Sequence, residues 1–460
     1  MIRTIERGMD FLTDHYLAVC LFIALFILTW AGVGDIPTVS VLGMILCLAG
    51  FARQAVLVDL WILFPLILYN LAGMVSSYAA YRNITDGYAS LHLVYPVIYL
   101  LMACLEEEEV RLLRRLCVVW AGVVAAAGIG SFVSRAVLQG SAGRMEGFPG
   151  NPNATGIFLV LGWFALMGCD EEEEEKESVP SLILSCVEPL LLIALALTLS
   201  MGSFTAMAVG ILVVLTGKRK GSSGRKIFRY ACRLLSGASL GVGTGVLLYL
   251  AAARTSVAWI CLPLLVYGLA VVLCWNKYKR FLKEYPWMAV IISVCGLVVA
   301  AAVIAVRPGS VATFTERLEM MRNGLGYLVM HPLTGVGPYQ WRILNLHDSD
   351  KYFNTWHIHN VLLHVGVEQG WIAMGTLLFM AARFFGKKPE LWKKAGFMAF
   401  CIHNMMDTSF FYMSIMALMM MTAGNPRKGG RRMINAGSRA AFGIFAVMFA
   451  YHLYFYITHG

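Results

Sequence analysis

Apolar runs long enough to cross a membrane recur along almost the whole chain, for example at 17–33, 56–76, 181–199 and 287–306. A helix of about 20 apolar residues spans the ~30 Å hydrocarbon core of a bilayer. A water-soluble domain could not bury so many helices that are apolar on every face. Charged residues make up only 14% of the chain, against about 25% in soluble domains. The sequence therefore predicts an all-α, polytopic integral membrane protein with about 12 to 15 transmembrane helices.

The distribution of Lys and Arg predicts how these helices are oriented. Basic residues cluster in the connections 217–229, 276–283, 383–394 and 427–432. Cytoplasmic loops carry the excess of Lys and Arg, so these clusters and the N-terminus are expected on the cytoplasmic side of the inner or plasma membrane. The expected spans are 16–33, 38–52, 56–79, 88–104, 116–138, 153–169, 181–199, 202–216, 235–253, 256–274, 287–306, 366–385, 392–405, 409–423 and 440–457.

One connection on the opposite face, 307–365, is far longer than the others. It contains Tyr339, Trp341 and Trp356 together with several Arg and His residues, a composition unlike that of a disordered segment. A long ordered loop in a compact protein is usually functional. We therefore expect a structured extracytoplasmic loop, with a short helix over 316–329 that ends at His331-Pro332.

Charge and cysteine patterns exclude other classes of protein. The net charge is +10, but the basic residues lie in short clusters between apolar runs, which is typical of topology-setting loops and not of a nucleic-acid surface. The 11 cysteines are scattered and include no Cys-x-x-Cys pair, so neither a disulfide framework nor a zinc site is expected. No cofactor or metal is expected. The acidic runs 106–109 and 170–177 are interpreted as solvated connectors.

Three segments on the predicted outer face carry residues suited to chemistry. The first, Arg144–Asn153, reads Arg-Met-Glu-Gly-Phe-Pro-Gly-Asn-Pro-Asn, and its Pro and Gly residues predict an irregular turn. A fixed guanidinium such as that of Arg144 can hold phosphate oxygens bidentately, with Asn153 beside it. The alternative is an interfacial loop with an ordinary snorkelling arginine.

The second segment runs from Thr315 to Pro338. Arg317 and Arg322 fall in the predicted short helix, and the Gly335-Val336-Gly337-Pro338 turn would let the backbone come close to a partner or a ligand. The alternative is a surface helix followed by a structural turn.

The third segment, 357–370, reads His-Ile-His-Asn-Val-Leu-Leu-His-Val-Gly-Val-Glu-Gln-Gly and enters a predicted span. Histidine exchanges protons near neutral pH, so His359 is a candidate general base. His357, Asn360 and Glu368 are candidate substrate-binding residues. A metal site at His357, His359 and His364 and a purely structural role for these histidines are the alternatives, but the spacing fits no common helical metal site.

Together the three segments resemble the O-antigen ligase and polymerase family of bacterial surface-polysaccharide enzymes. The resemblance rests on the Arg…Gly-Asn-Pro-Asn turn, on an Arg segment before Pro-Leu-x-Gly-Val-Gly-Pro, and on His-Asn-x-x-Leu…Glu-x-Gly entering a span. It covers roughly residues 140–385. It implies three parts of the chain: N-terminal helices over 1–139, a ligase-like core over 140–385, and C-terminal helices over 386–460.

The resemblance implies metal-independent glycan transfer on the extracytoplasmic face. An undecaprenyl-diphosphate-linked glycan would be the donor, and a hydroxyl of a glycan, lipid or protein the acceptor, in the synthesis of a cell-envelope polysaccharide. His359, Arg317 and Arg144 would be the catalytic residues, meeting in one water-accessible pocket just beyond the lipid. The family's Ser-Arg-Gly turn reads Ser200-Met201-Gly202 here; either Arg144 or Arg254, at another outer span end, replaces the missing arginine, or the diphosphate is held more weakly than in the family.

Two rival functions use the same topology. A transporter or flippase of lipid-linked glycans would carry charged residues at mid-membrane, and only Asp59 and Glu188 lie well inside predicted spans. A non-enzymatic scaffold or sensor would need no outer cluster of Arg and His. Ligase and polymerase share these motifs, and the sequence does not choose between them.

Overall fold

The computed structural model describes residues 13–32, 34–53, 56–140, 142–175, 182–219, 223–253, 259–306, 310–347, 355–424 and 431–459. Its contacts divide the chain into two compact units. Unit 1 comprises Met1–Arg114, Val311–Pro389 and Asn404–Gly460, and unit 2 comprises Arg115–Ser310 and Glu390–His403. The three sequence segments with boundaries at 139/140 and 385/386 stay a prediction.

Helices make up nearly all regular structure, which confirms the all-α, polytopic class. Among the described residues, eight helices are long and apolar enough to cross a membrane, and six further apolar helices are described over only 10–17 residues each. The described residues also contain one short antiparallel pair of strands, β1 (Val56–Val58) and β2 (Arg431–Met433).

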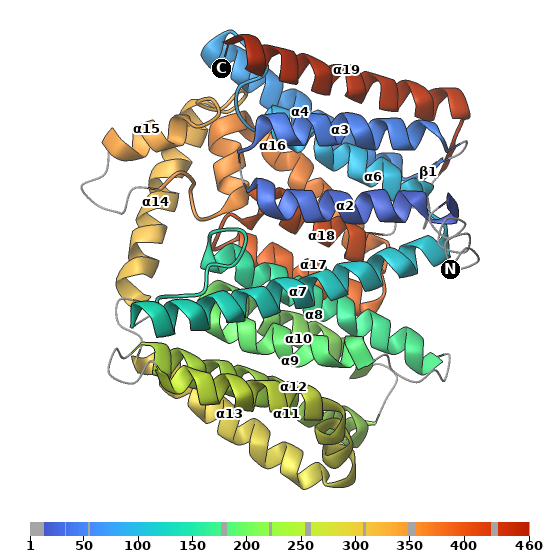
Figure 1. The fold of residues 1–460 in the computed structure, drawn as a ribbon. Coiled ribbons are helices and arrows are strands. Elements are labelled where there is room, and N and C mark those ends of the chain that lie inside the picture. The colour runs from blue at the N-terminus through green and yellow to red at the C-terminus, as the bar shows by residue number, and fades with distance from the viewer. Residues whose placement is uncertain are drawn as a thin grey trace. The chain divides into compact units, whose positions relative to one another are not determined.

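In unit 1, α2 (Tyr16–Ala31), α3 (Ile36–Phe51) and α19 (Asn435–His459) run side by side (Figure 1). Two glycines of α3 receive aromatic rings of α19: a methyl group on Gly43 would lie 2.4 Å from Phe449, and one on Gly50 would lie 2.5 Å from Phe442. Small residues thus let these two helices approach closely, as is typical of membrane helix pairs. The helices of the unit are α2 (Tyr16–Ala31), α3 (Ile36–Phe51), α4 (Leu60–Tyr81), α5 (Tyr88–His92), α6 (Val94–Cys104), α14 (Ser310–Met330), α15 (Gln340–His347), α16 (Val361–Gly386), the 3-10 helix η2 (Ser409–Phe411), α18 (Met413–Ala423) and α19 (Asn435–His459).

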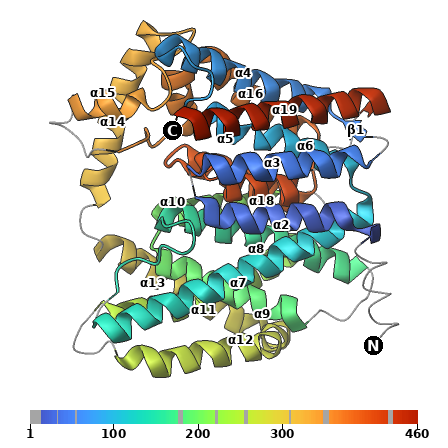
Figure 2. The same cartoon turned by 45° about the horizontal axis from the view of Figure 1, so that its top comes forward.

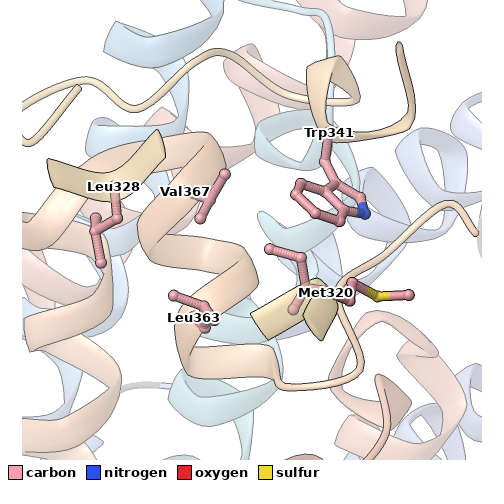
Figure 3. Packing of buried hydrophobic residues seen from close by; sticks show 6 residues of the cluster. Met320, Leu328, Trp341, Leu363 and Val367 are labelled. Carbon is pink, nitrogen blue, oxygen red and sulfur yellow. The ribbon is translucent and has the colours of Figure 1, made fainter. Parts of the chain in front are cut away.

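Helix α14 runs across the direction of α2, α3 and α19 in both views (Figures 1 and 2). Its buried side carries Met320 and Leu328, which pack with Trp341, Leu363 and Val367 from α15 and α16 (Figure 3). The predicted helix over 316–329 is therefore confirmed, and it is longer at its N-terminal end.

Unit 2 is a second helical bundle. Its α9 and α11 pack through a glycine, because a methyl group on Gly245 would lie 2.4 Å from the carbonyl oxygen of Ile193. Its elements are most of α7 (Glu107–Gln139), α8 (Pro152–Glu175), α9 (Leu182–Thr198), α10 (Met201–Arg219), α11 (Gly224–Ala252), α12 (Cys261–Glu284), α13 (Pro286–Val306) and nearly all of α17 (Leu391–Asn404).

The acidic runs are solvated only in part, and the described residues 107–109 and 170–175 lie within helices; Glu106, Glu107 and Glu108 are exposed as expected. Residues 107–109 form the first turn of α7, where acidic side chains favour the helix dipole. Glu109 is buried and pairs with Arg53 at 2.6 Å. In the second run, Glu171 lies within α8 and pairs with Lys218 at 3.1 Å. The sequence did not predict these pairs because each joins segments far apart in the chain.

The two acidic residues inside predicted spans are both paired. Asp59 lies just before α4 and caps it by accepting a hydrogen bond from the backbone of Trp61. It also contacts Lys387 at 2.6 Å and Arg383 at 3.1 Å, at the far end of α16. Glu188 accepts a hydrogen bond from the Trp275 indole and pairs with a lysine of α12, Lys279. The predicted span 56–79 was wrong at its start, because residues 56–58 form β1.

Candidate active site

Two of the predicted catalytic residues approach one carboxylate in unit 1. Arg317, on α14, donates through Nη1 to the carbonyl oxygen of Met406 at 2.6 Å. Its Nη2 lies 4.0 Å from Asp407 Oδ2. The Nδ1 atom of His359 lies 3.9 Å from the same carboxylate oxygen. The structure thus brings Arg317, His359 and Asp407 together from three separate stretches of chain.

Asp407 was not among the residues predicted from the sequence. It is almost fully buried, and its Oδ1 accepts a hydrogen bond from the backbone of Thr408 at 2.8 Å, which leaves Oδ2 facing Arg317 and His359. The sequence offered one indication of Asp407. This residue is the acidic side chain of the short connection 406–408, which joins two predicted spans on the same predicted outer face as the histidines.

Asn360 fixes the backbone beside His359. Its side-chain oxygen caps α16 by accepting from the backbone of Leu363 at 3.0 Å, and its Nδ2 donates to the carbonyl oxygen of Met405 at 3.3 Å. Asparagine is among the favoured residues at this position of a helix. The cap therefore starts α16 at Val361, five residues earlier than the predicted span, and ties it to the 405–407 turn.

His357 lies in the same segment but is held in an apolar setting. Its ring stacks on Phe411 with a centroid distance of 4.7 Å. Burial, and then the nearby His359, lower the pKa of His357 to about 4. Its imidazole is therefore uncharged at neutral pH, where it can act as a hydrogen-bonding group but carries no charge to attract phosphate.

The first turns of α16 end in a break at Gly370, which has φ 85°. The carbonyl of Val367 accepts from Val336 at 2.8 Å, and that of Glu368 accepts from Gly337 at 3.1 Å and from the Ser76 hydroxyl at 2.6 Å. Backbone groups freed by a helix break must find other partners in a buried setting. The 336–337 turn supplies them, so the partner of this glycine-rich turn is α16 itself.

The break explains why the turn contains glycine. Gly335 has φ 67°, and a methyl group there would lie 2.3 Å from the carbonyl carbon of Glu368. We expect Gly335→Ala to lower the free energy of unfolding by about 2–4 kcal/mol, through positive-φ strain and backbone overlap. Thermal unfolding of the purified protein measures this. The control is Gly326→Ala on α14, where a methyl group meets nothing within 4 Å; equal melting temperatures for the two variants would contradict the explanation.

The remaining predicted residues of unit 1 differ in exposure. The Glu368 side chain is 0% exposed, and its Oε1 accepts from the backbone of Trp341 at 3.1 Å. Arg322 is exposed on α14.

In unit 2, Arg144 and Asn153 form the predicted pair. Arg144 Nη2 donates to Asn153 Oδ1 at 2.6 Å, and its Nε donates to the carbonyl oxygen of Thr198 at 2.8 Å. The backbone of Asn153 is held in turn by the Asn151 side chain at 2.8 Å, which starts α8. The guanidinium is thereby oriented by two hydrogen bonds, and it is more constrained than a snorkelling surface arginine.

Arg144 contacts Thr198, just before the Ser200-Met201-Gly202 segment. Thr198 lies two residues before Ser200, the first residue of the Ser200-Met201-Gly202 turn. The hydroxyls of Ser200 and Ser203 are 2.8 Å apart on that turn, and a methyl group on Gly202 would lie 3.4 Å from His403. Arg254, the other candidate replacement, lies outside the described residues.

The fold and these contacts define a class: a helical membrane protein in which an arginine, a histidine and an aspartate gather near the start of a broken helix. Residues 240–379 match the family model described as O-Antigen ligase. The matched range includes Arg317, His359 and Glu368 but not Arg144 or Asn153. Comparison with curated proteins gives no match. The family match supports a glycan-transferring enzyme of the ligase or polymerase kind.

Proposed function

We propose that the chain transfers a glycan from a lipid diphosphate to the hydroxyl group of an acceptor on the extracytoplasmic face of the membrane. The observation that carries the proposal is the convergence of Arg317 and His359 on Asp407, within 4.0 and 3.9 Å. These two residues lie in separate motifs of the matched family segment. Their meeting supports one site with both a cation and a base.

The proposed reaction uses Arg317, His359 and Asp407 together with the donor and the acceptor. The bond between the anomeric carbon and the diphosphate oxygen breaks, the acceptor oxygen bonds to that carbon, and the hydroxyl proton passes to His359. Nδ1 of His359 lies toward Asp407, so we assign Nε2 as the atom that takes the proton of the acceptor, and the carboxylate stabilises the imidazolium that forms. Arg317 stabilises charge on the departing diphosphate. An in-line displacement inverts the anomeric centre.

The donor class follows from where the reaction takes place. Beyond the cytoplasmic membrane no nucleotide sugar is at hand, so the activated bond must travel on the donor lipid, for which undecaprenyl diphosphate is our proposal. Its polyprenyl tail would remain in the bilayer between apolar helix faces. The acceptor hydroxyl belongs to a glycan, a lipid or a protein.

Arg144 is our candidate for the arginine that the family carries at the position of Met201. Its Nε contacts the Thr198 carbonyl, and Asn153 holds the other side of the fork. A guanidinium arriving from a neighbouring turn can supply the same planar pair of donors as one within the turn.

Metal independence gives a direct prediction. Since the guanidinium of Arg317 supplies the positive charge for the leaving group, we expect turnover by the purified protein to be unchanged by excess chelator. Glycan transfer is measured with and without the chelator, and the control is re-addition of Mg²⁺ or Mn²⁺. Loss of activity that a divalent cation restores would contradict the arginine-only scheme.

The experiment that tests the function in cells is analysis of lipid-linked intermediates after deletion of the gene. Loss of a ligase leaves long glycan chains on the lipid diphosphate, whereas loss of a polymerase leaves single repeat units. A flippase, the rival function, would instead leave intermediates on the cytoplasmic leaflet. The pairing of Asp59 with Arg383 and Lys387 at helix ends favours the enzyme, because it removes one candidate for a mid-membrane charge.

A further inference from the structure

We propose that His364 and Glu368 form a buried pair that positions His359 for proton transfer and makes no contact with substrate. The inference rests on the proposed function, because it assigns these residues to the action of the same base. Both side chains are 0% exposed, one helical turn apart on the same face of α16. A substrate could not reach either group without opening the fold.

The hydrogen bonds of His364 define which of its nitrogens carries a proton. The backbone N–H of Ile358 donates to His364 Nδ1 at 3.3 Å. A backbone N–H can only donate, so Nδ1 presents a lone pair and the proton of the neutral ring is on Nε2. That Nε2 lies 3.0 Å from the Tyr88 hydroxyl and 3.4 Å from Glu368 Oε2. His364 is thus an acceptor toward the 355–360 segment and a donor toward Tyr88, with Glu368 Oε2 close to the same nitrogen.

Glu368 holds this arrangement from the other side. Its Oε1 accepts from the backbone of Trp341 on α15, while Oε2 faces His364. A carboxyl oxygen 3.4 Å from Nε2 favours the tautomer of the imidazole that carries its proton on that nitrogen. Tyr88, from α5, completes the set of groups beside the ring.

Hydrogen bonds therefore hold the backbone on both sides of His359. Ile358, the preceding residue, donates to His364, and its buried side chain belongs to the same hydrophobic cluster as Met320 and Trp341. Asn360, the following residue, caps α16 and bonds to the Met405 carbonyl. A base acts efficiently only when held within about 0.5 Å of its working position, and these ties provide that constraint.

The test compares two substitutions of one residue in the purified, full-length protein, with a lipid-linked glycan as donor. His364→Asn keeps an acceptor close to the position of Nδ1, whereas His364→Leu removes it. We expect His364→Leu to lower kcat by about 10–100-fold with little change in donor KM, because orientation is lost and ground-state binding is kept. We expect His364→Asn to retain most of kcat, with the pH profile of wild type, because His359 remains the titrating base.

Matched variants separate positioning from folding. His452→Leu, a buried histidine on α19, should leave kcat unchanged, and Glu368→Gln, which keeps the acceptor for Trp341, should cost less than Glu368→Leu. Wild-type kcat in His364→Leu would overturn the inference, as would a His364→Asn enzyme as inactive as His359→Ala. If His364→Leu does not fold, the kcat values of His364→Asn and Glu368→Gln test the inference. No transfer by wild type itself would overturn the proposed function instead.

Discussion

His359→Ala is expected to abolish glycan transfer while the protein still inserts into the membrane at wild-type levels. Removal of a general base costs about 10²–10⁴-fold in rate. His359 makes no contribution to the apolar core, and its side chain is 17% exposed beside Asp407. The loss should therefore appear in kcat and not in the amount of folded protein. The measurement is glycan transfer by the purified variant, with abundance in the membrane fraction as the companion readout.

A second histidine of the same segment, 307–365, provides the control. His347 is exposed at the end of α15, so His347→Ala should retain wild-type transfer. If His359→Ala transferred glycan as fast as the wild type, the assignment of this residue as the base would be wrong.

Arg317→Lys is expected to reduce transfer by about 10²-fold or more, although the positive charge is kept. The guanidinium uses its two terminal nitrogens separately, with Nη1 on the Met406 carbonyl and Nη2 toward Asp407. A lysine has a single terminal nitrogen and cannot satisfy this fork and a diphosphate at once. The drop should be seen in kcat/KM for the lipid-linked donor, since the lost contacts are made to the leaving group.

The control for this substitution is Arg439→Lys, at an exposed position on α19 in the same unit. We expect no change in kcat/KM there. Equal kinetics for Arg317→Lys and wild type would show that a point charge is enough. This result would contradict the claim that the leaving group needs the guanidinium of Arg317.

Periodicity and composition predicted the fold class because hydrocarbon imposes a simple rule on every span. The boundaries were less predictable where a polar residue starts a helix. Asp59 and Asn360 both cap helices. Neither cap can be recognised from the mean hydropathy of the surrounding residues, on which the span boundaries were based. The break at Gly370 was also hidden, since the turn that fills it lies more than thirty residues earlier in the chain.

For the site, the sequence predicted Arg317, His359 and the Arg144–Asn153 pair because each stands in a motif with its own chemical meaning. Asp407 was missed because it stands outside the motifs and becomes informative only when its neighbours in space are known. Glu368 was predicted to bind substrate, and the structure gives it buried partners, Trp341 and His364. A motif indicates that a residue matters without telling whether it faces the ligand or supports a residue that does.

The most direct test of the central claim is reconstitution of the purified protein in vesicles with an undecaprenyl-diphosphate-linked glycan and a candidate acceptor. If Arg317 and His359 catalyse transfer, each new glycosidic bond will be matched by one released undecaprenyl diphosphate, and His359→Ala will stop both together. Movement of the intact lipid-linked glycan between leaflets, with no new bond and no free lipid diphosphate, would contradict the account.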